Sequence, residues 1–208
     1  MQIGDNIEFN KYIWRVLDIQ GNAALIITEN IIGQRAYHNI FTDVTWATCE
    51  LRRYLNGEFY DKFDENNKSR IIPVINKNPD NPWYGAKGGE DTEDKVFLLT
   101  IEDVVCRYFG DSSERLKNRG EKEKYWYQKR DNNNYKRMAT YGSYKWWWWL
   151  RSPGRINSVA AYIFGDDGGV GIHGNPVLFG KKSKNGGVIY PLDGNINGGV
   201  RPALWLKL

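Results

Sequence analysis

The chain has 208 residues, of which 41% are hydrophobic and 26% are charged, and its formal net charge is +4. These values exclude a disordered chain and predict one globular domain, residues 1–208, because domains span about 100–200 residues. No run reaches the ~18 consecutive apolar residues of a membrane span, and the first residues lack the basic start and apolar stretch of a secretory signal. We therefore expect no membrane insertion and a location in the cytoplasm or on a phage particle.

The first predicted elements are the two strands of a hairpin. Residues 12–19 alternate between apolar and polar side chains, residues 20–22 form a Gln-Gly-Asn turn, and residues 23–28 return as an apolar run. Because the returning strand is apolar throughout, we expect both of its faces to be covered.

A helix is predicted next, over residues 48–55. Thr48 can cap its amino-terminal end, and its leucines recur at helical spacing. The Asn-Gly pair at 56–57 is expected to end it. Phe59 and Phe63 then continue the apolar stripe in a second short helical piece.

A second helix has a stronger start signal. Thr100 and Asp103 stand at the spacing of a capping box, and Gly110 stands where the helix should end. Before it, residues 96–99 are predicted to form a buried strand. Residues 76–93, which contain several prolines and glycines, are predicted to form a long loop.

The positive charge is concentrated in residues 107–137, which hold ten Lys and Arg against five Asp and Glu. Residues 125–127 add three aromatic rings, so the segment is a possible nucleic-acid-binding module. The interleaved acidic residues and the Asn run at 132–134 favour a solvated loop instead. We keep nucleic-acid binding as an alternative function.

The amino-acid composition of the chain changes after residue 141. Residues 142–208 are rich in glycine, with short apolar runs, and predict short strands joined by irregular loops. Together with a hairpin-and-helix part at 1–141, this predicts an α+β fold. Within the tryptophan run at 146–149, Trp148 and Trp149 are predicted to be core residues.

Catalytic and metal sites have little support. The two cysteines, Cys49 and Cys106, and the two histidines, His38 and His173, are isolated, so we expect no disulfide framework, no metal site and no cofactor. No nucleophile elbow, phosphate-binding loop or His-Glu-x-x-His motif is present. We expect that the protein is not an enzyme.

Two sequence boxes carry a resemblance to a known family. They are Trp-Trp-Leu-Arg-Ser-Pro-Gly at 148–154 and Gly-Val-Arg-Pro-Ala-Leu-Trp-Leu at 199–206. The chain resembles a large bacterial and phage family of uncharacterised domains with these boxes. The resemblance implies a C-type-lectin-like fold, shared with formylglycine-generating enzymes. It also implies kinship with the variable proteins of diversity-generating retroelements, in which a mutagenic reverse transcriptase rewrites residues near the carboxyl terminus.

The residues that carry the other known activities of this fold are absent from this sequence. The enzymes of this fold use cysteines late in the chain, and none follows Cys106. The calcium site of C-type lectins needs Glu-Pro-Asn or Gln-Pro-Asp with Trp-Asn-Asp, and neither arrangement is present. Asp166 and Asp167 alone offer too few oxygen ligands for a hard cation.

The residues between and beside the two boxes are the predicted binding surface. We expect Ile156, Val159, Ala161 and Ile163 to pack into the core, and the polar and aromatic residues around them to be displayed. Ordinary loop and exposed-strand roles are the alternative for each displayed residue. The predicted ligand-binding residues are Tyr144, Trp146, Trp147, Arg155, Asn157, Ser158, Tyr162, Phe164, Asp166, Asp167, His173 and Asn175. The box arginines, Arg151 and Arg201, are expected to hydrogen-bond backbone carbonyls that irregular loops leave unpaired.

The sequence therefore predicts a target-recognition protein, a variable protein of a diversity-generating retroelement that displays a mutable surface to a protein or carbohydrate target. The alternatives are a fixed-specificity cell-wall or carbohydrate-binding domain and the nucleic-acid-binding module at 107–137.

Overall fold

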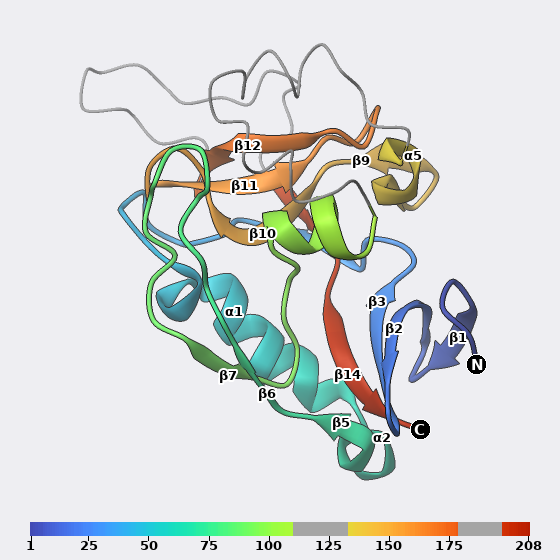
Figure 1. Cartoon of the computed structure of the whole chain (residues 1–208). Helices are drawn as coiled ribbons and strands as arrows, with labels where there is room; N and C mark the ends of the chain where they lie inside the picture. The colour runs from blue at the N-terminus through green and yellow to red at the C-terminus, as the bar shows by residue number, and fades with distance from the viewer. Residues whose placement is uncertain (110–132, 179–196) are drawn as a thin grey trace.

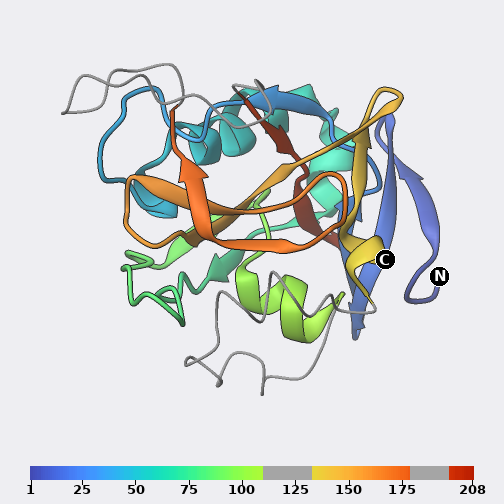
Figure 2. The same ribbon diagram turned by 90° about the horizontal axis from the view of Figure 1, so that it is seen from above.

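The computed structural model describes residues 1–109, 133–178 and 197–208. Within these ranges the chain forms two five-stranded sheets, two short hairpins and several short helices (Figures 1 and 2). The predicted α+β class is therefore confirmed. No helix in the described ranges is both long enough and apolar enough to cross a membrane.

The first sheet joins strands from both ends of the chain. The predicted hairpin is confirmed, and every residue of its second strand after Ala23 is buried. The last strand of the chain pairs antiparallel with that second strand, with Trp205 opposite Leu25. In order across the sheet, the strands are β1 (Asn6–Phe9), β2 (Tyr12–Gln20), β3 (Ala23–Thr28), β14 (Ala203–Lys207) and β5 (Ile71–Ile72).

The first helical segment is longer than predicted, and its α-helix is capped one residue later. Its amino-terminal cap is Cys49, whose Sγ accepts a hydrogen bond from the Arg52 amide at 3.4 Å, so the predicted Thr48 cap is wrong. The Asn-Gly pair at 56–57 does not end it, because Asn56 Oδ1 accepts from the Lys95 amide at 2.8 Å and holds the chain in a π-helical turn. The elements are η1 (Trp46–Thr48), α1 (Glu50–Tyr54), η2 (Leu55–Phe59), η3 (Tyr60–Lys62) and α2 (Glu65–Arg70).

The predicted apolar stripe is confirmed, since Phe59 and Phe63 are buried and their ring centroids lie 5.4 Å apart. The capping box is also confirmed. The Thr100 amide donates to Asp103 Oδ2 at 2.8 Å, and the Asp103 amide donates to Thr100 Oγ1 at 3.1 Å, directly before η4 (Asp103–Arg107). The predicted helix end at Gly110 lies outside the described residues.

Residues 96–99 are buried as predicted but do not form a strand, because they make a single β-bridge, from Phe97 to Ala203. The predicted loop at 76–93 is irregular along most of its length. Two short paired strands, β6 (Val74–Asn76) and β7 (Thr92–Asp94), close its ends.

The second sheet contains the first family box. Trp148 pairs with Ile163 and Trp149 with Tyr162, and both tryptophans are fully buried as predicted. The sheet lies at the end of the molecule opposite the C-terminus (Figure 1). Its order is β12 (Val170–Pro176), β11 (Val159–Ile163), β10 (Trp148–Pro153), β13 (Gly198–Val200) and β4 (Gly33–Arg35). Beside it stand α5 (Asn134–Arg137) and the hairpin of β8 (Ala139–Tyr141) and β9 (Tyr144–Trp146).

The two box arginines have the predicted role. Arg201 is fully buried, and its guanidinium donates to the carbonyl oxygens of Thr28 at 2.8 Å and Arg137 at 3.2 Å. Arg151 donates to the carbonyl oxygen of Leu98. Each guanidinium thus satisfies carbonyls from segments far away in the sequence, which ties the second sheet to the rest of the fold.

Candidate functional site

The structure leaves nine of the twelve predicted binding residues at least partly accessible and buries three. The accessible ones are Tyr144, Trp146, Arg155, Asn157, Phe164, Asp166, Asp167, His173 and Asn175. The buried ones are Trp147, Ser158 and Tyr162.

The prediction that Trp147 and Tyr162 are displayed is therefore wrong. Trp147 packs edge-on against Trp149, with ring centroids 4.6 Å apart, and Tyr162 packs against Trp147 at 5.5 Å. Gly171 makes room for the Tyr162 ring, because a Cβ at that position would overlap it. The positions that were expected to face solvent are thus occupied by aromatic rings that pack on one another.

Two further expectations are corrected at the turn between β10 and β11. Ser158 is buried, although it was predicted to be displayed, and its carbonyl accepts from the Val177 amide at 3.1 Å. Ile156 was predicted to pack into the core but is 51% exposed. The Val159 amide closes a tight turn on the Ile156 carbonyl at 3.2 Å, and the isoleucine is the first residue of this turn, outside the strand that enters the core.

The accessible residues lie on β9, in the turns at the two ends of β11 and on β12, where the ring centroids of Phe164 and His173 are 6.5 Å apart. Arg155 and Asn157 lie in the turn before β11, where Asn157 Nδ2 donates to the carbonyl of Lys87 at 2.7 Å. Asp166 and Asp167 lie in the turn after β11. That second turn packs closely on Trp146, since a Cβ at Gly165 would lie 2.6 Å from the Trp146 carbonyl carbon.

A pocket of about 560 Å³ lies along β4, the edge strand of the second sheet. The sequence alone does not predict it, because its walls come from residues far apart in the chain, and Val200 is the one described lining residue that lies in a family box. We call it the edge pocket. Its described lining residues are Gly33, Gln34, Arg35, Ala36, His38, Asn39, Glu50, Leu51, Tyr54, Tyr141, Asn197 and Val200.

Arg35 provides the positive charge of the edge pocket, and its side chain is held in one position. Its guanidinium lies over the Tyr54 ring, with the carbon atom 3.5 Å from the ring centroid, and its side chain is 45% exposed. Glu58 approaches the guanidinium to 3.5 Å from outside the lining. Stacking on the aromatic ring holds the fork of N–H groups in place without consuming its hydrogen bonds.

His38 and Glu50 form a second polar wall. The Glu50 amide donates to His38 Nδ1 at 3.3 Å, and the Glu50 carboxylate pairs with Arg53 at 2.6 Å. Burial lowers the pKa of His38, Arg53 lowers it further, and Glu50 opposes them. The net lowering favours the neutral imidazole, which matches an Nδ1 that accepts a hydrogen bond.

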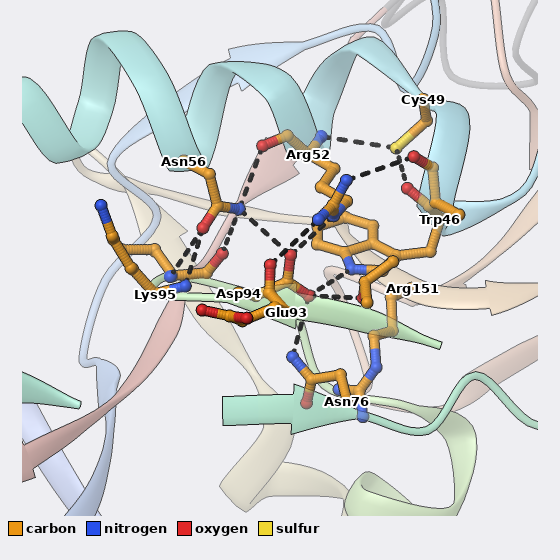
Figure 3. A network of polar contacts seen from close by, with 12 residues as sticks. Trp46, Cys49, Arg52, Asn56, Asn76, Glu93, Asp94, Lys95 and Arg151 are labelled. Carbon is orange, nitrogen blue, oxygen red and sulfur yellow. Dashed lines mark hydrogen bonds and ion pairs between the residues drawn. The ribbon is translucent and has the colours of Figure 1, made fainter. Parts of the chain in front are cut away.

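A buried network anchors the helix that carries Tyr54 and Glu50 (Figure 3). The Asp94 carboxylate, fully buried, accepts from Arg52 Nε at 2.6 Å, from Trp46 Nε1 at 2.9 Å and from Asn76 Nδ2 at 2.9 Å. Arg52 lies between Glu50 and Tyr54 in α1, so this ion pair fixes the helix while its neighbours line the edge pocket.

The edge pocket adjoins one of the predicted groups. The Trp146 indole nitrogen donates to the carbonyl of the lining residue Asn197 at 3.2 Å, and the Trp146 ring centroid lies 6.4 Å from that of Tyr141. Tyr144, on the same hairpin, is 73% exposed. The pocket and the aromatic residues of β9 therefore form one contiguous surface.

The described lining of the edge pocket combines one cation, Arg35, and one carboxylate, Glu50, with amide groups and aromatic rings. The described ranges hold no group of three His, Cys, Asp or Glu placed to bind a metal ion. Over residues 21–208 the chain matches the family described as a domain of unknown function (DUF6273). Because the match covers most of the chain, the protein belongs to this family. No curated protein and no solved structure matches it.

Proposed function

We propose that the protein is a target-recognition protein, a variable protein of a diversity-generating retroelement on a C-type-lectin-like scaffold. One observation carries the proposal. Polar and aromatic residues at both ends of β11 are accessible, whereas every residue of the strand between them is buried. A rigid core that carries accessible side chains on turns is the arrangement that binding surfaces use.

The arrangement of the chain supports a C-type-lectin-like fold. The last strand, β14, returns to pair with β3, so the beginning and the end of the domain share one sheet. The second sheet and the turns between its strands β10, β11 and β12 are formed by segments between them, and this sheet lies at the end of the molecule opposite the C-terminus (Figure 1). Sequence changes in those turns leave the pairing of the first sheet untouched.

The burial pattern narrows the proposed variable set to the nine accessible residues. Substitution at Trp147, Ser158 or Tyr162 would open cavities or leave polar groups unpaired, at a cost of about 1–5 kcal/mol. The accessible positions carry a smaller cost, since exposed substitutions usually change stability by about 0.5 kcal/mol or less. Among the nine, Trp146 and Phe164 are partly buried against the core, so substitutions there should cost more than at the other seven. A surface that tolerates many different sequences needs this difference in stability cost between its displayed and its buried positions.

One observation favours the alternative of a fixed-specificity binding domain. Most lining residues of the edge pocket lie between Gly33 and Tyr54, outside the segment proposed to vary. A pocket with constant walls would bind the same chemical group in every variant. The nucleic-acid alternative concerns residues 107–137, most of which lie outside the described residues.

The first test uses nucleotide sequence. A neighbouring reverse-transcriptase gene, with a template repeat that matches the coding region of the proposed variable residues and differs at adenines, is the expected finding. A gene neighbourhood without either element would contradict diversification.

The second test uses a library randomised at the nine accessible residues, with a matched library at Trp147, Ser158 and Tyr162. Most members of the first library should keep the wild-type melting temperature, and selection on panels of proteins and glycans should recover different binders. Most members of the matched library should unfold. A folded first library that never produces a binder would refute the recognition role.

A further inference from the structure

The edge pocket has a rigid construction that a constant binding site requires. The β4 strand pairs with β13, Arg35 opposite Gly198, and the Trp149 indole donates to the Arg35 carbonyl at 2.9 Å. The side chain of Arg35 is held over Tyr54, and α1 is anchored by the ion pair of Arg52 with Asp94. Both walls are thus fixed before any ligand arrives, which lowers the entropic cost of binding.

The Arg35 guanidinium can receive an external carboxylate. Its neighbour Glu58 is 74% exposed, and its 3.5 Å approach is a surface ion pair, which is a weak interaction in water. A carboxylate that enters the pocket can instead make two parallel N–H···O bonds to the planar fork. Glu50 is the one carboxylate among the described lining residues, and Arg53 already neutralises it.

The rest of the lining suits a polypeptide. Gln34, Asn39 and Asn197 supply amide groups that can both donate to and accept from peptide bonds. Among the described strands, β4 has β13 as its one neighbour, and its backbone lines the pocket. An exposed strand edge is a common docking place for an extended peptide.

We propose that the edge pocket binds an acidic side chain on an extended segment of a protein target, with Arg35 receiving the carboxylate. The inference rests on the proposed recognition function and adds to it a constant anchor beside the variable residues of β9. It does not require diversification, because Arg35 and Tyr54 lie outside the varied segment.

The test is a selection of displayed seven-residue random peptides on the wild-type protein, with counter-selection on Arg35→Gln. The expected peptides are enriched in Asp or Glu and bind Arg35→Gln at least about tenfold more weakly, the effect of losing charge-assisted hydrogen bonds. Replacing the acidic residue of a selected peptide by Asn or Gln should cause a similar loss. Arg35→Lys should recover part of the affinity, because it keeps the charge and loses the fork.

Two further variants test whether a loss of peptide binding comes from misfolding and not from the missing guanidinium. Arg70→Gln removes an exposed arginine that neither lines the pocket nor pairs with a lining residue, and this variant should bind the peptides about as well as the wild type. Glu58→Gln removes the competitor of the ligand carboxylate, so it should bind them more tightly, an effect that misfolding cannot produce.

Selected peptides without acidic enrichment, equal binding to Arg35→Gln, or no selected peptide would overturn the proposal. Binding of citrate or an acidic oligosaccharide that depends on Arg35, without any peptide, would show a small-molecule site and overturn the protein-target assignment. Failure here leaves the nine-position library unaffected, and failure of that library leaves Arg35-dependent peptide binding unaffected, so the two proposals fail separately.

Discussion

The indole nitrogen of Trp149 donates a 2.9 Å hydrogen bond to the carbonyl oxygen of Arg35, across the intervening strand β13. This bond links the first family box to a residue of the edge pocket that lies 114 positions away. It is possible because Gly198, which faces Arg35 in the ladder, has no side chain. A core tryptophan of the box therefore also positions the strand that carries the candidate anchor.

Gly198→Ala tests this relationship. A Cβ there would overlap the Trp149 indole and lie 2.6 Å from the Trp147 ring, and both rings are buried, so neither can move freely. We expect a loss of about 1–3 kcal/mol in the free energy of unfolding, as for other overpacked cores. Chemical denaturation gives the measurement.

Gly33→Ala is the matched control, on the neighbouring strand β4. Its Cβ would meet nothing within 4 Å, so the lower entropy of the unfolded chain should leave it neutral or stabilised by up to about 1 kcal/mol. Equal effects of the two substitutions would show that the close approach of Gly198 to Trp149 does not contribute to the free energy of unfolding.

The two family boxes should differ in their response to tryptophan removal. Trp149 is fully buried, and Trp149→Ala should cost about 3–5 kcal/mol. Trp205 is only partly buried on the first sheet, so Trp205→Ala should cost less than about 2 kcal/mol. Denaturation midpoints of the two variants measure the difference, and a larger effect at Trp205 would contradict the burial assigned here.

The sequence predicts elements whose signals are local. The hairpin of β2 and β3 follows from alternation and a turn, and the Thr100–Asp103 box follows from spacing alone. The burial of Tyr162 is a feature that local sequence signals do not predict. It was expected to be displayed between the packing residues Ala161 and Ile163, but its burial depends on Trp147, which directly precedes β10, and on Gly171 of β12.

The edge pocket could not be predicted from local sequence signals either. Arg35 and Tyr54 meet because α1 is held by Asp94, which comes forty positions later in the chain than Tyr54. No spacing in the sequence encodes that contact. The helix boundary at 56–57 fails for the same reason, since Asn56 bonds to residues 95 and 96 instead of stopping the helix.

Asp94→Asn should show how much the pocket wall depends on the buried network. The substitution removes the charge that Arg52 pairs with and turns an N–H group towards donors, so we expect a loss of about 3 kcal/mol or more. Asp91→Asn breaks the exposed pair with Lys77 and should cost about 1 kcal/mol at most. Urea denaturation of both variants provides the comparison, and similar losses would mean that the network is dispensable.

His38 should make stability depend on pH at the edge pocket. Burial, with a contribution from Arg53, lowers the pKa of His38 below its ordinary value of 6.5, against the opposite effect of Glu50. As the pH falls through 6.5, the unfolded chain binds this proton before the folded chain does, so the free energy of unfolding decreases until the lower folded pKa is passed. Above 6.5 the imidazole is neutral in both states, and this contribution to the pH dependence vanishes.

The measurement is the free energy of unfolding from pH 7.5 to pH 5, for the wild type and for His38→Gln. Gln can still accept a hydrogen bond from the Glu50 amide but does not titrate, so its curve should fall less steeply below pH 6.5. The difference between the two curves isolates His38 from the carboxylates that titrate in both proteins. A steeper fall for His38→Gln would mean that protonation of His38 stabilises the fold, and that the imidazole accepts no hydrogen bond from Glu50.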